Sequence, residues 1–190
     1  MYINITPVTM RSTSIFLVAI SSLLFCLLSC SRDLRSAREA ARFMESRITI
    51  PRYLLKIENG TVSDYYYSYS LPLLIQYYGP DACSECVLAR IKDNYELIEW
   101  GRTSHLFETM IIMSPKEQEK EEIINKLVCL KGEYPVFIDV HSVIAHQNVV
   151  PSDSRFHMFL VDYSGKPICI GNPLKSPTAR SRFLKQIYNN

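Results

Sequence analysis

The two residues of this sequence best suited to chemistry are cysteines, in the segment Cys83-Ser84-Glu85-Cys86. A cysteine thiolate attacks disulfides, and a second thiol one helical turn away can attack the mixed disulfide that results. This spacing predicts thiol-disulfide exchange, in which Cys83 attacks and Cys86 resolves. Because the same spacing also occurs in zinc sites, the elements around the pair decide how it is interpreted.

Those elements place the pair at the start of a helix. Apolar residues 73–78 predict a strand, a Gly-Pro-Asp turn follows, and apolar residues then recur every three to four positions from Val87 to Ile98. The first amides of a helix carry partial positive charge and lower the pKa of a nearby thiol. Glu85 acts the other way, because a carboxylate beside a thiolate raises the pKa of that thiol.

The chain beyond this helix alternates between strands and helices. Strands are predicted over four apolar segments, which are residues 106–113, 135–140, 156–162 and 166–171. The last two form a hairpin across Gly165. Helices are predicted after Ser114, as the N-cap of a capping box, and after Ser176. This order predicts an α/β fold of three layers, with a mixed central sheet and helices on both faces.

The amino terminus predicts export. An apolar run over residues 15–28 follows Met10-Arg11 and ends at Leu27-Leu28-Ser29-Cys30, which is similar to a bacterial lipobox. We expect Cys30 to carry a lipid that anchors the protein in the membrane, with translation starting at Met1 or Met10. An uncleaved anchor or an ordinary signal peptide is the alternative. Each of these places the protein in the cell envelope, facing the periplasm or the cell surface.

The expected organisation has three parts, which are a signal peptide over residues 1–30, a membrane-proximal spacer over 31–60 and the folded domain over 61–190. The length of 190 residues, with 47% hydrophobic content, fits one globular domain with a leader. A net charge of +2 without a basic run argues against nucleic acid as a partner. We expect Cys129 and Cys169 to be buried single thiols, and a disulfide between them is the alternative.

Residues 71–188 resemble the thioredoxin-like superfamily, and with the lipobox the chain is similar to TlpA-type exported thiol-disulfide oxidoreductases. The segment from Phe159 to Lys166 resembles the penultimate hairpin of that family. The resemblance implies Cys83 as nucleophile, Cys86 as resolving cysteine, no organic cofactor, and protein thiols or disulfides as partners. The chain departs from the family at Ala82, where an aromatic residue is usual, and at Phe156 or His157, where a cis-proline is expected.

Two other interpretations of the pair stay open. Two thiolates with His157 would suit copper(I) or zinc, which would make the protein a metal carrier. A thioredoxin-like binding module that has lost its chemistry would retain the same fold. Peroxide reduction is disfavoured, because Gln76 and Pro80 stand where the peroxiredoxin motif needs proline and threonine or serine.

Overall fold

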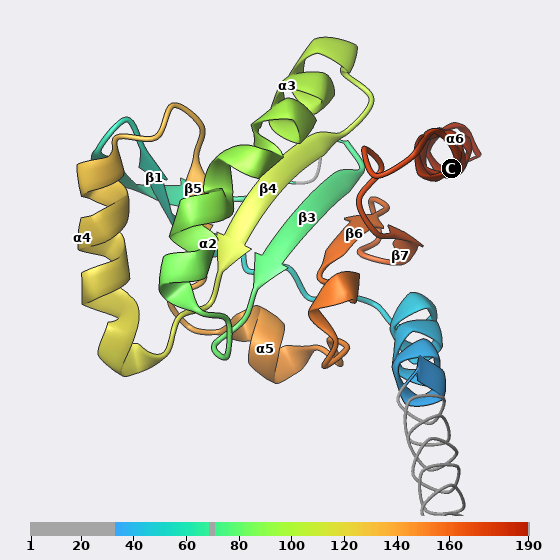
Figure 1. Ribbon diagram of the computed structural model, residues 1–190, viewed down its shortest axis with the longest axis horizontal. Helices are drawn as coiled ribbons and strands as arrows, with labels where there is room; N and C mark the ends of the chain where they lie inside the picture. Colours follow the sequence, from blue (N-terminus) through green and yellow to red (C-terminus); the bar gives the residue numbers. More distant parts are fainter. Residues whose placement is uncertain (1–32, 69–70, 190) are drawn as a thin grey trace, which may run out of the picture. The chain divides into compact units, whose positions relative to one another are not determined.

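The computed structural model describes residues 33–68 and 71–189 (Figure 1). The chain divides into two compact units, Met1–Arg38 and Glu39–Asn190, and the second carries the fold described below. The predicted signal peptide, with Cys30, lies outside the described residues. Among the residues that are described, no helix is long and apolar enough to span a membrane.

The described residues form one sheet of seven strands, in the order β2-β1-β5-β4-β3-β6-β7. The strands are β1 (Tyr53–Glu58), β2 (Thr61–Tyr66), β3 (Leu73–Tyr78), β4 (Glu108–Met113), β5 (Val136–Ile138), β6 (Met158–Val161) and β7 (Pro167–Ile170). The central strands β3, β4 and β5 run parallel, whereas β1, β2, β6 and β7 each join the sheet antiparallel to a neighbour. The sheet is therefore mixed, as predicted.

Helices connect these strands. They are α2 (Ser84–Arg90), α3 (Tyr95–Ser104), α4 (Lys120–Leu130), α5 (Val143–Gln147) and α6 (Pro177–Tyr188), with 3-10 turns η1 (Ile91–Asn94), η2 (Glu117–Glu119) and η3 (Ser154–Phe156). A further helical segment opens the second unit and ends at residue 45.

Hydrophobic side chains cover both faces of the sheet, because successive residues of a strand point in opposite directions. In β4, Ile112 packs on one face with Phe43 and with Ile144 of α5. Ile111 packs on the other face, where α2, α3 and α4 contribute apolar residues such as Val87. The three-layer α/β architecture predicted from the order of elements is confirmed.

The folded unit begins earlier than the sequence predicted. Strand β1 lies between β2 and β5, and Phe43, Ile48 and Leu54 are buried in the core. From Glu39 onward, the segment predicted to be a spacer is therefore part of the compact unit. The sequence did not reveal this, because the strand that pairs with β1 on its inner side, β5, lies far along the chain.

The predicted capping box at Ser114 is also wrong. Ser114 is fully buried and its hydroxyl donates to the Asp139 carboxylate at 3.0 Å, so it is not available as a helix cap. The chain instead enters α4 through the 3-10 turn η2. The predicted cap of the last helix is confirmed, because the Ser176 hydroxyl accepts from the Ala179 backbone N–H at 3.1 Å.

The predicted β6–β7 hairpin is confirmed, and its glycine is required. Gly165 has φ of +80°, and a Cβ atom at this position would lie 2.6 Å from the carbonyl oxygen of Ile48. Both the backbone angle and the close approach exclude a larger residue. The Ile48 N–H also donates to the Gly165 carbonyl at 2.7 Å, so this turn holds the amino-terminal segment of the unit.

The two outlying cysteines differ from each other. Cys169 is buried, as predicted, but Cys129 on α4 is exposed. The alternative disulfide is incompatible with the fold: α4 packs on β1, and β7, which carries Cys169, lies five strands away in the sheet. At ~4.8 Å per strand this separation is on the order of 24 Å, far beyond the reach of a disulfide.

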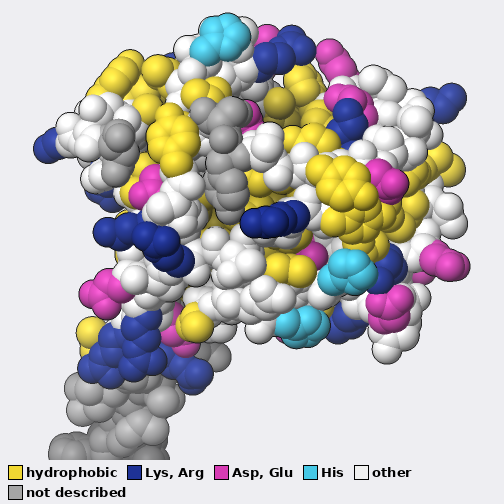
Figure 2. All heavy atoms as spheres, turned by 180° about the vertical axis from the view of Figure 1, so that it is seen from behind, with side chains coloured by type: hydrophobic (Ala, Val, Ile, Leu, Met, Phe, Trp, Pro, Cys, Tyr) yellow, Lys and Arg dark blue, Asp and Glu magenta, His cyan; other side chains and the backbone are white. Residues whose placement is uncertain are grey.

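The surface carries both signs of charge. On the face shown in Figure 2, acidic and basic side chains are interspersed, and hydrophobic side chains reach the surface between them. Among the large apolar residues that are exposed are Val62 and Tyr66 on the edge strand β2, and Val149 after α5.

Candidate active site

The two cysteines of the CxxC segment lie where the central strand β3 meets α2. A turn after β3 is closed by a hydrogen bond from the Ala82 N–H to the Gly79 carbonyl at 3.0 Å. Cys83 then takes the N-cap position of α2 with an extended backbone, and its sulfur accepts from the Cys86 N–H at 3.4 Å. Both thiols are exposed. The predicted placement at the helix start is therefore observed.

The environment of the pair distinguishes the two thiols. A hydrogen bond with the Cys86 side chain lowers the pKa of Cys83, and the Cys86 backbone N–H lowers it further. The same thiol–thiol hydrogen bond raises the pKa of Cys86. Cys83 is therefore the thiol of the pair that ionises first.

Glu85 opposes this effect, as predicted, but does not reverse it. Its carboxylate raises the pKa of Cys83, yet this contribution is smaller than those of the hydrogen bonds from Cys86. The Lys126 ammonium of α4 lies 3.5 Å from the Glu85 carboxylate and also pairs with Glu122 at 2.7 Å. These exposed ion pairs place a positive charge beside Glu85, which reduces its repulsion of a thiolate.

The predicted continuous helix after Cys83 is interrupted. Arg90 has φ of −107° and ψ of 3°, and the 3-10 turn η1 separates α2 from α3. Asn94, at the end of this turn, is buried and donates to the Tyr78 hydroxyl at 3.2 Å. The hydrogen bond links the interrupted helix to the end of β3, directly before the CxxC turn.

A cleft of about 370 Å³ lies beside the CxxC turn. One side is formed by the end of β3 and the turn through Ala82, the residue before Cys83, and the other by the segment between α5 and β6. We call residues 148–157 of that segment the cleft wall. The residues that line the cleft are Gln76, Tyr77, Tyr78, Gly79, Pro80, Asp81, Ala82, Ala145, Asn148, Val150, Pro151, Ser152, Ser154 and His157.

His157 lies at the end of the cleft wall and is held there. Its Nε2 atom lies 2.8 Å from the carbonyl oxygen of Pro151, and its own carbonyl accepts from the Tyr77 N–H at 2.8 Å. The chain reaches β6 through Phe156 and His157, the position at which the resemblance led us to expect a cis-proline, and no described residue has a cis peptide bond. His157 thus joins the cleft wall to β3.

The metal-carrier interpretation finds no support in this arrangement. Within residues 33–68 and 71–189, no three side chains of histidine, cysteine, aspartate or glutamate come together as a set able to hold a metal ion. The two thiols and His157 are therefore not assembled as the three ligands that this interpretation requires.

A buried polar pair at the ends of β4 and β5 was not predicted from the sequence. The Asp139 carboxylate, 1% exposed, accepts from the Ser114 hydroxyl and from the Val143 and Ile144 N–H groups at 3.0, 3.0 and 2.9 Å. Ser114 follows β4 and Asp139 follows β5. The carboxyl ends of parallel strands share one edge of a sheet, and this placement is the signal that would have paired them.

The order of strands around the CxxC segment decides the fold. Strand β3 leads into the cysteines and α2, β4 lies parallel on one side of β3, and the hairpin β6–β7 lies antiparallel on the other before the final helix α6. The chain has a thioredoxin-like fold. This agrees with the resemblance seen in the sequence.

Two solved structures with this kind of fold are similar to the chain. One is an uncharacterised thioredoxin-like protein of Porphyromonas gingivalis, with 17% identity, a TM-score of 0.41, and coverage of 76% of this chain and 92% of that one. The other is a Chlorobium tepidum protein assigned as thiol:disulfide interchange protein DsbE, with 10% identity, a TM-score of 0.44, and coverage of 75% and 98%. No protein-family model and no curated protein sequence matches the chain.

The link between the two thiols leads to a testable pH dependence. Replacing Cys86 with alanine is expected to raise the pKa of Cys83, because the side-chain hydrogen bond that lowers it most is lost. Only the thiolate is alkylated, so the rate rises as pH rises through this pKa, and the curve for Cys86→Ala moves to higher pH. Iodoacetamide labelling of Cys83 across a pH series, read by mass spectrometry, measures the shift.

Cys86→Ser is the matched control, because its hydroxyl can donate in place of the thiol. Its curve is expected to move less than that of Cys86→Ala. Coincident curves for the alanine variant and the unmodified protein would show that the Cys86 side chain does not set the reactivity of Cys83.

Proposed function

We propose that this protein is a thiol-disulfide oxidoreductase of the bacterial cell envelope, exchanging the Cys83–Cys86 dithiol or disulfide with protein partners. The observation that carries the proposal is the placement of two exposed thiols at the start of α2, where the Cys86 N–H donates to the Cys83 sulfur at 3.4 Å. Hydrogen bonding within the pair also lowers the pKa of Cys83 and raises that of Cys86, which favours Cys83 as the attacking thiol. The thioredoxin-like fold supports the same class of chemistry.

The chemistry needs only the two sulfurs. The Cys83 thiolate attacks a partner disulfide, forming a bond to one partner sulfur and releasing the other as a thiolate. Cys86 then loses its proton and attacks the Cys83 sulfur, which releases the second partner thiolate and leaves a Cys83–Cys86 disulfide. The partner gains two electrons and the protein loses two. The reverse sequence oxidises a partner dithiol.

The cleft beside Ala82 is the proposed binding place for the partner chain. It is open to solvent, borders the residue before the nucleophile, and combines apolar side chains such as Val150 and Pro151 with polar ones such as Ser152. An extended segment of polypeptide lying there would present its disulfide to Cys83.

The location of the protein is part of the proposal. Lipid on Cys30 would anchor the domain at the membrane, outside the cytoplasm, where disulfides of protein partners form and persist. Replacing Cys30 with serine should abolish incorporation of radiolabelled fatty acid. Labelling that is undiminished in this variant would exclude Cys30 as the lipid site.

A redox titration tests the proposed chemistry. The full-length protein in detergent, one sample treated with a metal chelator and one left untreated, is equilibrated in a series of thiol-disulfide buffers and its cysteines are alkylated for mass analysis. Cys83 and Cys86 should convert together as a two-electron pair, whereas Cys129 should not follow them. If Cys83 and Cys86 stay reduced throughout, or react only after a metal is removed, a binding module or a metal carrier replaces the oxidoreductase.

A further inference from the structure

The cleft wall is an irregular segment whose position depends on side-chain contacts. Between the end of α5 and the start of β6, its only regular element is the short 3-10 turn η3. A segment outside the sheet has no ladder of backbone hydrogen bonds to fix it. The contacts that replace such a ladder therefore determine the shape of the cleft.

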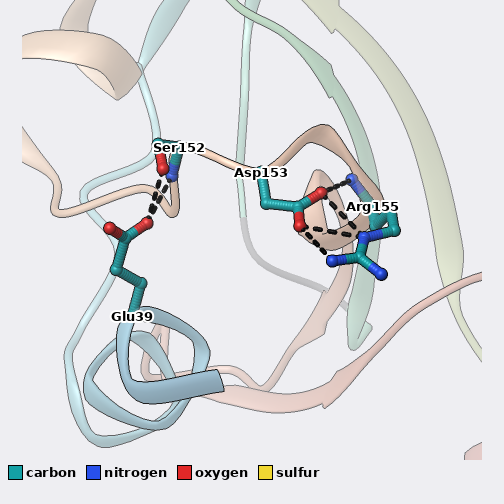
Figure 3. Close-up of polar contacts among 4 residues, drawn as sticks. All are labelled: Glu39, Ser152, Asp153 and Arg155. Carbon is teal, nitrogen blue, oxygen red and sulfur yellow. Dashed lines mark hydrogen bonds and ion pairs between the residues drawn. The ribbon is translucent and has the colours of Figure 1, made fainter. Parts of the chain in front are cut away.

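One of these contacts comes from the amino-terminal end of the compact unit. The Glu39 carboxylate accepts two hydrogen bonds from Ser152, one from its backbone N–H at 2.9 Å and one from its hydroxyl at 2.7 Å (Figure 3). Ser152 lines the cleft. Hydrogen bonds to an ionised acceptor are about twice as strong as neutral ones, so Glu39 is a substantial anchor for this wall.

A second contact reinforces the first. The Asn148 side chain accepts from the Thr49 N–H at 2.6 Å and donates to the Thr49 carbonyl at 3.0 Å. It also donates to the carbonyl of Ile144, the second residue of α5, at 3.2 Å. Asn148 thereby joins three segments, which are α5, the start of the cleft wall and the amino-terminal segment.

The amino-terminal segment is itself firmly placed, so it can act as a support. We call residues 39–50 the arm. Phe43 of the arm is fully buried and packs edge-on against Phe159 of β6, with ring centroids 4.8 Å apart. Ile48 is also buried, and its N–H is bonded to Gly165. The arm is therefore attached to the core at two points, one on each side of Ser46.

The wall has further contacts on either side of Ser152, and Val150 packs against the hydrophobic core. Asp153 binds the Arg155 guanidinium and the Arg155 N–H, and all of these groups lie within the wall (Figure 3). At its far end, His157 is bonded to β3. The Glu39–Ser152 contact differs from these because a charged side chain of the amino-terminal segment holds both the backbone and the hydroxyl of a residue that lines the cleft.

We propose that Glu39 is a positioning residue for the partner protein: by holding Ser152, it keeps the cleft wall in place to receive the polypeptide whose disulfide reacts with Cys83. This inference rests on the proposed function. Glu39 does not line the cleft, and the groups that shift the pKa of Cys83 are Cys86 and Glu85. Loss of the Glu39 carboxylate should therefore lower the rate of reaction with a protein disulfide without changing the intrinsic reactivity of the Cys83 thiol.

The test compares a protein disulfide with a small one. The reduced full-length protein in detergent is mixed with insulin or with 5,5′-dithiobis(2-nitrobenzoate), and second-order rate constants are measured. Glu39→Gln should lower the rate constant with insulin about fivefold, because its neutral amide oxygen accepts both hydrogen bonds more weakly than the carboxylate, a loss comparable to roughly one net hydrogen bond. The rate constant with the small disulfide should stay within about twofold. Ser152→Ala should lower the insulin rate constant to a comparable extent, because it removes one of the two hydrogen bonds and its backbone N–H still donates.

Glu45→Gln is the matched control, since Glu45 is an exposed glutamate of the same helical segment and the variant changes the charge equally. It should leave both rate constants unchanged. An insulin rate constant that is unaffected by Glu39→Gln would overturn the proposal. A parallel fall with both disulfides would overturn it too, because Glu39 would then act on the thiol itself.

Hydrogen–deuterium exchange separates this inference from the proposed function. The amides of residues 148–157 should exchange faster in Glu39→Gln than in Glu45→Gln, whether or not the protein reacts with disulfides. Equal exchange would show that Glu39 does not hold the wall. A protein that reacts with neither insulin nor the small disulfide would instead disprove the oxidoreductase function, with the exchange result still deciding the role of Glu39.

Discussion

Replacing Cys83 with serine is expected to lower the rate of disulfide reduction by at least about 100-fold, because a serine hydroxyl is not ionised at neutral pH and does not attack disulfides. Cys86 alone cannot complete the reduction, because the pair then has no second thiol to resolve a mixed disulfide. Single-turnover reaction of the reduced full-length protein with insulin measures this loss.

Two further variants make this result specific. Cys86→Ser should still attack but not resolve, so it should accumulate a mixed disulfide with insulin that a reducing agent dissolves. Cys129→Ser removes another exposed thiol, on α4, and should react normally. Activity retained in Cys83→Ser but lost in Cys129→Ser would transfer the nucleophile to α4 and contradict the assignment of the site.

The second large effect concerns the amino-terminal arm. Replacing Phe43 with alanine is expected to lower the free energy of unfolding by about 3–5 kcal/mol, the usual cost of removing a buried phenylalanine. Phe43 is 0% exposed and contacts Phe159 at the centre of one core, so truncation leaves a cavity next to the sheet. Denaturant unfolding of the reduced full-length protein in detergent, followed by tryptophan fluorescence, measures the change.

Tyr188→Ala is the control for this experiment, because Tyr188 is equally aromatic but 70% exposed at the end of α6. Its effect should stay within about 0.5 kcal/mol. If Phe43→Ala lowered the free energy of unfolding no more than Tyr188→Ala does, residues before Tyr53 would be a spacer after all. The arm could then not support the cleft wall.

The features that the sequence predicted well depend on neighbours in the chain. The CxxC segment lies at a helix start because a turn ends β3 and apolar residues of helical spacing follow, and the Ser176 cap needs only an N–H three residues on. The β6–β7 hairpin likewise follows from two apolar segments and Gly165, whose positive φ suits a tight turn. The order of these elements sufficed to predict a thioredoxin-like α/β fold.

Predictions failed where the surroundings of a side chain depend on how distant segments pack. Ser114 has the sequence context of a helix cap, but the parallel strands β4 and β5 bring Asp139 beside it, and a buried carboxylate requires a donor. Cys129 has apolar neighbours in sequence, yet it faces solvent because Ile123 and Leu127 occupy the buried side of α4. In each case the choice was made by packing between distant segments.

The sequence by itself therefore determined the identity and spacing of the reactive thiols, the elements on either side of them and the class of fold. Only the tertiary structure decided where the compact unit begins, which residues wall the cleft and what holds that wall. The reason is physical: helix periodicity, caps and turns involve atoms a few residues apart, whereas Glu39 and Ser152 are 113 residues apart and meet only because the sheet brings the arm and the wall together.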